Sequence, residues 1–353
     1  MRYPDYRAFW LGMLATVSGF QMLQFSQLWL MYQITGSPLS LGYVGLANAV
    51  PGILLNLFGG VFADRLDKRR LIIITQAVTA SLIFLLATLT FLGLVRQWHL
   101  LTIAFLVSAV EAFNQPARYA LFPHLIERKA LVSAVALNSS IWQGTRIIAP
   151  AVAGFIIAWA GTAVAFFLAG LGFLIMALMI SRLRMPPLTR RLRDGAVRDI
   201  LEGLTFIRQS SIFSFLITMT FFNSFFGLAY ITLMPVLAVD ILQVGAKGQG
   251  LLMGAGGVGS LLTTFWLSAR SNVGSNGWRI IGGGVMSGLS IVTLGLTSAL
   301  IGSFGLALAI MLIIGICNTT YATSIQSSLQ MLVPDNMRGR VMGFYGMTYN
   351  IMP

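Results

Sequence analysis

The chain is a succession of apolar runs, each about long enough to cross a bilayer, and this pattern limits its fold more than any other feature. A helix needs about 20 apolar residues to span hydrocarbon, and only helices or closed barrels satisfy every backbone polar group there. Ten runs have this length, and an eleventh begins at Val341. The ten cover residues 9–32, 41–62, 71–94, 100–122, 134–159, 163–181, 213–239, 248–269, 280–296 and 304–332. We therefore predict an all-α membrane protein.

The placement of basic residues predicts which loops face inward. Hydrophobic residues make up 57% and charged residues 9% of the chain, which excludes an ordinary soluble domain. With the N-terminus inside, Arg96 and Lys247 are the basic residues of the outer loops, Arg118 and Arg146 fall within runs, and all the others are cytoplasmic. This bias favours that orientation. The net charge of +13 then indicates contact with anionic lipid and no nucleic-acid partner.

A polar, basic stretch divides the runs into two sets. We expect an N-terminal half of six helices at 1–181, a basic cytoplasmic linker at 182–211, and a C-terminal half at 212–353 that stops in helix 11. A Phe-Pro pair at 122–123 and a Val-Pro pair at 333–334 each lead into charged residues after corresponding runs. This correspondence indicates a parallel repeat of two halves.

The turn between the second and third runs is densely charged, with six charged residues among the seven at 64–70. Such a block cannot lie in hydrocarbon. Gly60 would let a neighbouring helix approach closely, and Asp64 could pair with nearby arginines as a breakable cytoplasmic gate. The other interpretation is that the basic residues only set the topology. The residues of this loop motif are Gly60, Asp64, Arg65, Lys68, Arg69 and Arg70.

The loop motif resembles motif A of the major facilitator superfamily of secondary transporters, with Asp67 where the family usually has its second glycine. Residues 110–118, 122–123, 136–138 and 146–154 resemble the bacterial branch that includes enterobactin exporters and macrolide efflux proteins. The resemblance implies the major facilitator superfamily fold of two six-helix halves, the second incomplete here. We therefore expect a fragment of a twelve-helix protein or a truncated product.

Part of the fifth run resembles the antiporter motif of the superfamily's fifth helix. Gly144, Pro150 and Gly154 match it, while Ala149 and Ala153 replace expected glycines. Proline kinks a helix, and small residues let it pack or rock against another. The resemblance implies export of a solute in exchange for a proton.

Glu111 is the carboxylate that lies deepest in a run, about eleven residues from either end of the fourth. Ionisable residues at that depth usually mark a substrate or proton path. Arg146 reaches a similar depth in the fifth run, so we predict an ion pair between Glu111 and Arg146 that couples protons to transport. Arg118, two turns from Glu111, would snorkel or reach Asp64. The alternative is a fixed pair that locks the two helices together.

Uncharged polar residues within the runs are candidates for lining a substrate cavity. Amides and aromatic side chains suit a bulky, partly apolar solute. The alternative for each is interhelical hydrogen bonding without a ligand. The candidates are Gln21, Gln24, Gln27, Asn114, Gln115, Asn138, Asn223, Tyr230, Asn318 and Tyr321.

These features together predict a transporter of the bacterial cytoplasmic (inner) membrane that exports a small amphipathic compound, such as a drug or siderophore, by proton antiport. We expect no enzyme, catalytic residue, metal or cofactor, because no His, Asp and Glu cluster at one membrane face. The expected partners are the substrate, protons and the bilayer, and the chain is expected to be a monomer. The alternatives are an importer or lipid or metabolite facilitator of the same fold, and a truncated remnant that does not transport.

Overall fold

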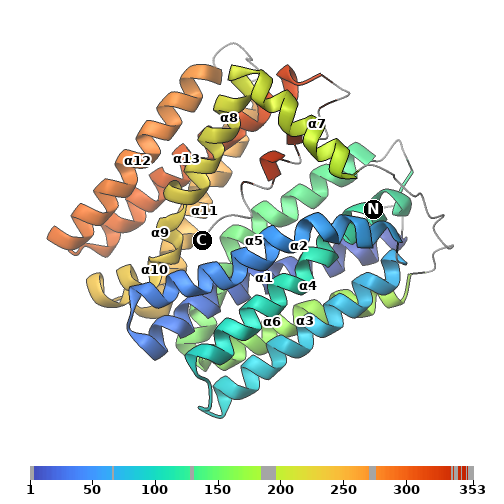
Figure 1. Ribbon diagram of the computed structural model, residues 1–353. Helices are drawn as coiled ribbons and strands as arrows, with labels where there is room; N and C mark the ends of the chain where they lie inside the picture. The colour runs from blue at the N-terminus through green and yellow to red at the C-terminus, as the bar shows by residue number, and fades with distance from the viewer. Residues whose placement is uncertain are drawn as a thin grey trace. The chain divides into compact units, whose positions relative to one another are not determined.

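The protein is built from helices that divide into two units, Met1–Arg193 and Asp194–Pro353 (Figure 1). No strand occurs in the residues that the computed structural model describes, so the all-α prediction is confirmed for them. The predicted linker, 182–211, straddles the division of the two units. The described residues are 4–65, 67–127, 131–183, 196–269, 276–334, 337, 341–342, 344–346 and 348.

Unit 1 is organised around its first helix, which packs against α5 and most extensively against α6. Close approach of α1 and α6 requires glycine. A Cβ on Gly19 would lie 2.6 Å from the Ala169 carbonyl oxygen, and one on Gly172 would collide with the Ala15 carbonyl oxygen. The elements of unit 1 are α1 (Pro4–Thr35), α2 (Pro38–Arg65), α3 (Lys68–Phe91), α4 (Gln97–Leu121), the 3₁₀ turn η1 (Phe122–Leu125), α5 (Leu131–Ala160) and α6 (Thr162–Ser181).

Unit 2 contains one interrupted span. The seventh apolar run forms α8 (Ser211–Phe222), α9 (Ala229–Thr232) and α10 (Met234–Val236), separated or followed by the π-helical segments η3 (Asn223–Gly227) and η4 (Leu237–Ile241). Pro235 lies within this stretch and cannot donate a backbone hydrogen bond. The remaining helices are α7 (Ala196–Gln209), α11 (Gly245–Ala269), α12 (Asn276–Leu300) and α13 (Phe304–Leu332).

Nine helical segments of the described chain are long and apolar enough to cross a membrane. The first helix, α1, has 32 residues but is not among them. Gln21, Gln24 and Gln27 lower its hydropathy, which accounts for the difference. The predicted count of ten full spans is therefore not confirmed, whereas a multi-pass membrane protein is.

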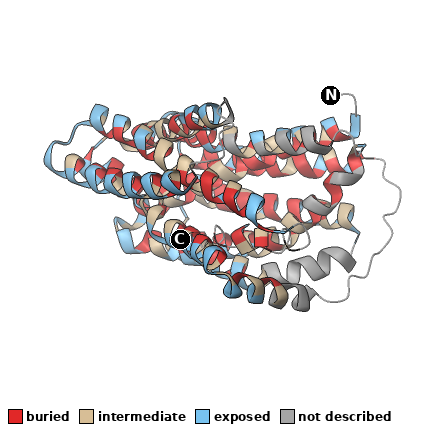
Figure 2. Cartoon of the chain, turned by 90° about the horizontal axis from the view of Figure 1, so that it is seen from above, coloured by how far each residue is buried: buried red, intermediate tan, exposed pale blue. Residues whose placement is uncertain are grey.

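Buried and exposed positions follow one another along the helices where burial is described, as the red and pale blue bands of Figure 2 show. Many of the exposed side chains are large and apolar. Ile74, Leu85 and Phe155, for example, are 59%, 52% and 45% exposed. Such extensive apolar exposure is what a lipid-facing surface requires.

Candidate functional site

The ionisable centre of unit 1 is a buried ion pair within a single helix. Glu111 and Arg118 both lie on α4, and the Arg118 Nη2 to Glu111 Oε2 distance is 3.2 Å. Their side chains are only 15% and 9% exposed. Seven residues advance a helix by about 10.5 Å, or two turns, so the two long side chains must reach along the helix to meet.

Pro116 lies between the two partners of this pair, inside α4. Because proline has no N–H, it removes the hydrogen bond to the carbonyl of Ala112 and tends to kink the helix. The ion pair therefore spans the position at which proline leaves the α4 backbone without one of its hydrogen bonds.

The predicted pair between Glu111 and Arg146 is wrong. Arg146 lies on α5 and is exposed, although its neighbours Thr145 and Ile147 are buried. Glu111 pairs with Arg118 instead. Equal depth along two helices does not fix their rotation, and α5 turns Arg146 away from unit 1. The suggested contact of Arg118 with Asp64 lies outside the described side chains.

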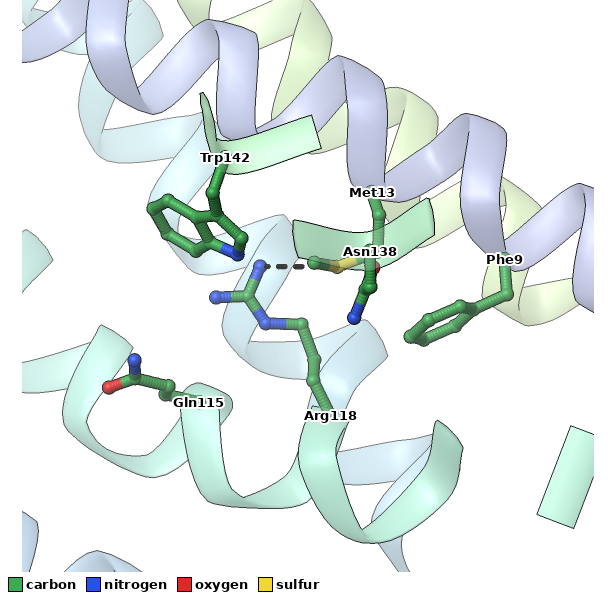
Figure 3. A pocket seen from close by; sticks show the side chains of 6 residues that line it. All are labelled: Phe9, Met13, Gln115, Arg118, Asn138 and Trp142. Carbon is green, nitrogen blue, oxygen red and sulfur yellow. Dashed lines mark hydrogen bonds between the residues drawn. The ribbon is translucent and has the colours of Figure 1, made fainter. Parts of the chain in front are cut away.

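A small pocket lies on one side of Arg118, between α1, α4 and α5 (Figure 3). Its empty volume is about 250 Å³, a figure that includes open solvent outside the pocket. The pocket itself has room for about one water molecule. Arg118 enters it with Nη1 3.8 Å from the Met13 sulfur, a weak contact. The Oδ1 atom of Asn138 is buried there without a partner in the described structure. The lining residues are Phe9, Met13, Gln115, Arg118, Asn138 and Trp142.

A second polar group joins α4 to α3 and α3 to α1. The Nδ2 atom of Asn114 donates to Thr75 Oγ1 at 2.7 Å, and Thr16 Oγ1 donates to Gln76 Oε1 at 3.2 Å. All four side chains are buried. The predicted cavity residue Asn114 therefore bonds to α3, whereas Gln115 and Asn138 line the pocket.

Thr16, Thr75, Gln76 and Thr79 were not singled out from the sequence, although α3 carries polar residues at 75, 76 and 79 of an otherwise apolar helix. Residues one and four positions after Thr75 lie on neighbouring sides of a helix, so this spacing could have indicated a polar face toward the interior.

The loop motif contributes a structural contact that the sequence did not suggest. Arg69 donates from Nε to the Ile180 carbonyl oxygen at 3.2 Å and from Nη2 to that of Ser181 at 2.6 Å. It thus satisfies carbonyl groups at the C-terminus of α6, where a cation is also favoured by the helix dipole. Asp67 caps the start of α3 by accepting from the backbone N–H of Arg70 at 3.0 Å.

The gate itself involves residues whose side chains are not described. Gly60, Asp64 and Arg65 lie within α2, and the side chains of Asp64 and Arg65 are outside the described structure. Lys68 begins α3 and is half-buried. The gate stays a prediction.

The residues that match the antiporter motif lie along α5. Pro150 and Gly154 are buried in unit 1. Gly144 has open space where a Cβ would be, so no neighbouring helix requires a glycine there.

Three candidate cavity residues of unit 2 take part in contacts between helices. Asn318 Nδ2 donates to Asn223 Oδ1 at 3.5 Å, joining α13 to η3. Tyr321 donates from its hydroxyl to the Met219 carbonyl oxygen at 2.8 Å. These contacts fit the alternative of interhelical hydrogen bonding for these three residues.

The other candidates differ in burial. Gln21, Gln24 and Tyr230 are half-buried. Gln27 is fully buried, and neither amide atom of its side chain has a partner in the described residues.

The sequence profile of proteins described as transmembrane secretion effectors matches residues 1–351, almost the whole chain. The chain belongs to this family of major facilitator transporters. Curated relatives include macrolide efflux protein A of Streptococcus pyogenes, 24% identical over 236 residues, which cover 65% of this chain and 58% of that protein. The staphyloferrin A transporter of Staphylococcus aureus is 29% identical over 238 residues, or 64% of this chain and 57% of that protein.

A longer match joins this chain to the multidrug efflux pump Tap of Mycolicibacterium fortuitum, 24% identical over 90% of this chain and 79% of the pump. The chain spans about 58% of the length of the macrolide efflux protein in their alignment. These relatives confirm the family expected from the loop motif and the fourth and fifth runs. Two of them are named efflux proteins, and the third is named a transporter.

Solved structures show the same fold. A bacterial homologue of the iron transporter ferroportin, in its inward-facing state, matches with a TM-score of 0.71 at 18% identity, covering 98% of this chain and 88% of that one. A bacterial homologue of the human lysosomal transporter Spinster, inward-facing and unoccupied, gives 0.75 at 16% identity, covering 98% and 80%. The major facilitator fold is thereby confirmed.

Proposed function

We propose that this protein exports a small amphipathic compound across the bacterial cytoplasmic membrane in exchange for protons. The buried pair of Glu111 and Arg118 is the observation that carries this proposal. A carboxylate at membrane depth costs stability, and such residues usually serve a function. The names of the relatives, macrolide efflux, multidrug efflux and staphyloferrin transport, support an amphipathic substrate of drug or siderophore type.

In the proposed cycle, Glu111 carries the proton and Arg118 responds to it. Protonation removes the carboxylate charge, so Arg118 becomes an uncompensated cation in a buried site. That state favours rearrangements that rehydrate the guanidinium. Because the pair spans Pro116, its loss also releases a constraint on the bend of α4. Proton release restores the pair.

The remaining assignments extend this scheme. Gln115 and Asn138 line the pocket beside Arg118, so they are the candidates for contact with the solute there. Asp64 and the arginines of the loop motif would close the cytoplasmic side of the pathway, with the N-terminus inside. The proposal includes no enzymatic step, and it treats a single chain as the transporting unit.

The proposal is tested in everted membrane vesicles that contain the protein, with a fluorescent amphipathic dye as substrate. Acidifying the vesicle interior should drive dye uptake, and Glu111→Gln should abolish it because the amide cannot carry the proton. Glu127→Gln makes the same chemical change outside the span and should retain uptake. Uptake that survives a protonophore, or that persists in Glu111→Gln, would refute the antiport mechanism.

A further inference from the structure

Four buried polar atoms near Glu111 have no hydrogen-bond partner in the described part of the chain. They are Oε1 of Glu111, Oδ1 of Asn114, Oγ1 of Thr79 and Nε2 of Gln76. The side chains of Asn114, Thr79 and Gln76 are fully buried. Unsatisfied polar atoms at such depth reduce stability unless water or a ligand satisfies them.

The helix register places these atoms together. α3 and α4 are consecutive, joined by five residues, and they pack against each other, so they run antiparallel. The bond from Asn114 to Thr75 fixes which faces meet. From it, Thr79 lies about 6 Å along α3 and Glu111 about 4.5 Å along α4, both toward the same end of unit 1. Glu111 and Thr79 therefore lie at nearly the same level on facing sides.

We propose that α3 and α4 enclose a hydrated niche, holding one or two water molecules, that connects Oε1 of Glu111 to Thr79, Asn114 and Gln76. Arg118 binds the other carboxylate oxygen, Oε2. The two oxygens of Glu111 thus have different tasks: one forms the ion pair, and the other exchanges its proton with the niche. This proton role rests on the proposed antiport function, whereas the presence of water does not.

Water fits the niche better than a cation does. The unsatisfied atoms comprise three oxygens and one amide N–H group, and water can both donate to the oxygens and accept from the amide. A metal cation would share the site with a carboxylate that Arg118 already neutralises, which would leave a net positive charge buried.

No other described charge lies near enough to offset that imbalance. The helices that pack against α4 include α1, α2 and α3. The described side chains of α2 carry no charge, and the charged residues of α1 and α3 lie in their first turns: Asp5 and Arg7 on α1, and Lys68 to Arg70 on α3. Arg70 is nine residues from Thr79, about 13.5 Å along the helix axis. Arg118 is therefore the charged group that faces Glu111 among the described side chains.

The niche is tested by infrared difference spectroscopy of the purified protein in detergent, with H₂¹⁶O replaced by H₂¹⁸O. We expect an isotope-shifted band from buried water that is lost in Thr79→Val and in Glu111→Gln. Thr88→Val is the matched control, because Thr88 is an exposed threonine on the same helix. A spectrum without such a band, or a band unchanged in Thr79→Val, would overturn the proposal.

Thermal unfolding of Thr79→Val gives a second, independent test. Valine has the shape of threonine without the hydroxyl. If the niche is hydrated, the substitution strands a water molecule and should lower the midpoint temperature. If the niche is dry, it removes an unsatisfied buried hydroxyl, so an unchanged or raised midpoint contradicts the proposal.

The two proposals can fail separately. If water is detected but dye uptake does not depend on the proton gradient, the niche stands and its role in antiport is lost. If uptake requires the gradient and Glu111 but no water is detected, antiport stands and the niche is refuted.

Discussion

Arg118 and Arg146 show that the depth of a charged residue along a span does not decide its role. The side chains around it do. Arg118 meets Glu111 along one helix, whereas Arg146 is exposed on another. Removing one partner of a buried pair leaves the other charge uncompensated, which costs more than losing the attraction alone. The intact pair therefore adds little net stability, but the loss of either residue alone should be strongly destabilising.

A double-mutant cycle tests this view. Arg118→Leu and Glu111→Leu should each lower the free energy of unfolding by about 3–5 kcal/mol, because each leaves a buried charge alone. The double variant should recover most of the loss. Arg146→Leu, at an exposed position, should change the free energy by no more than about 0.5 kcal/mol. Chemical denaturation in detergent micelles measures all four variants, and additive single losses would contradict the assignment.

At the scale of the helix, sequence predicted position along the membrane but not rotation about the axis. Apolar runs located most of the spans, and counting residues placed Glu111 deep in α4. Which face of α5 carries Arg146 could not be predicted, because the polar residues near it in the sequence, at 138–140, 143 and 145, fall on several sides of the helix and mark no single face. Lipid tolerates apolar residues on all sides, so the pattern that orients soluble helices is missing.

The same absence of pattern hid the contacts between helices. The bond from Asn114 to Thr75 depends on how α3 and α4 are rotated relative to each other, and the polar residues at 75, 76 and 79 indicate the inward face of α3 but not its partner on α4. The breaks in the seventh run were also missed. A π-helical turn contains one extra residue rather than a distinctive composition, so η3 and η4 resemble ordinary apolar helix.

The close packing of α1 against α6 depends on glycine. Gly19→Ala would place a methyl group against the Ala169 carbonyl oxygen, 2.6 Å away, so the helices must separate. We expect a loss of about 1–3 kcal/mol, as for an overpacked core. Gly144→Ala is the matched control, because open space surrounds that position, and alanine should stabilise α5 by up to about 1 kcal/mol. Thermal unfolding should therefore shift in opposite directions, and equal shifts would refute the packing argument.

At the scale of the whole molecule, the exposed apolar side chains indicate a bilayer, and the positions of the basic residues indicate which end of unit 1 faces the cytoplasm. Large apolar side chains are exposed on both units. Basic residues are concentrated in the loops at the end of unit 1 where α1 begins, including Lys68, Arg69 and Arg70 at the start of α3. Because basic loops remain on the cytoplasmic side, this end should face inward. The pocket beside Arg118 lies toward the same end, since α4 finishes there.

That orientation decides between export and import, because a pathway that opens beside Arg118 must face the compartment that supplies the solute. In a Cys317→Ser background, we expect Trp98→Cys, at the start of α4, to react with a membrane-impermeant maleimide added to intact cells. Glu127→Cys, just beyond η1 at the other end, should react only in everted vesicles. Both positions are exposed, so accessibility of the side chain itself does not separate them. Labelling of position 127 from outside would reverse the topology, and the pocket would then receive solute from the exterior, as an importer requires.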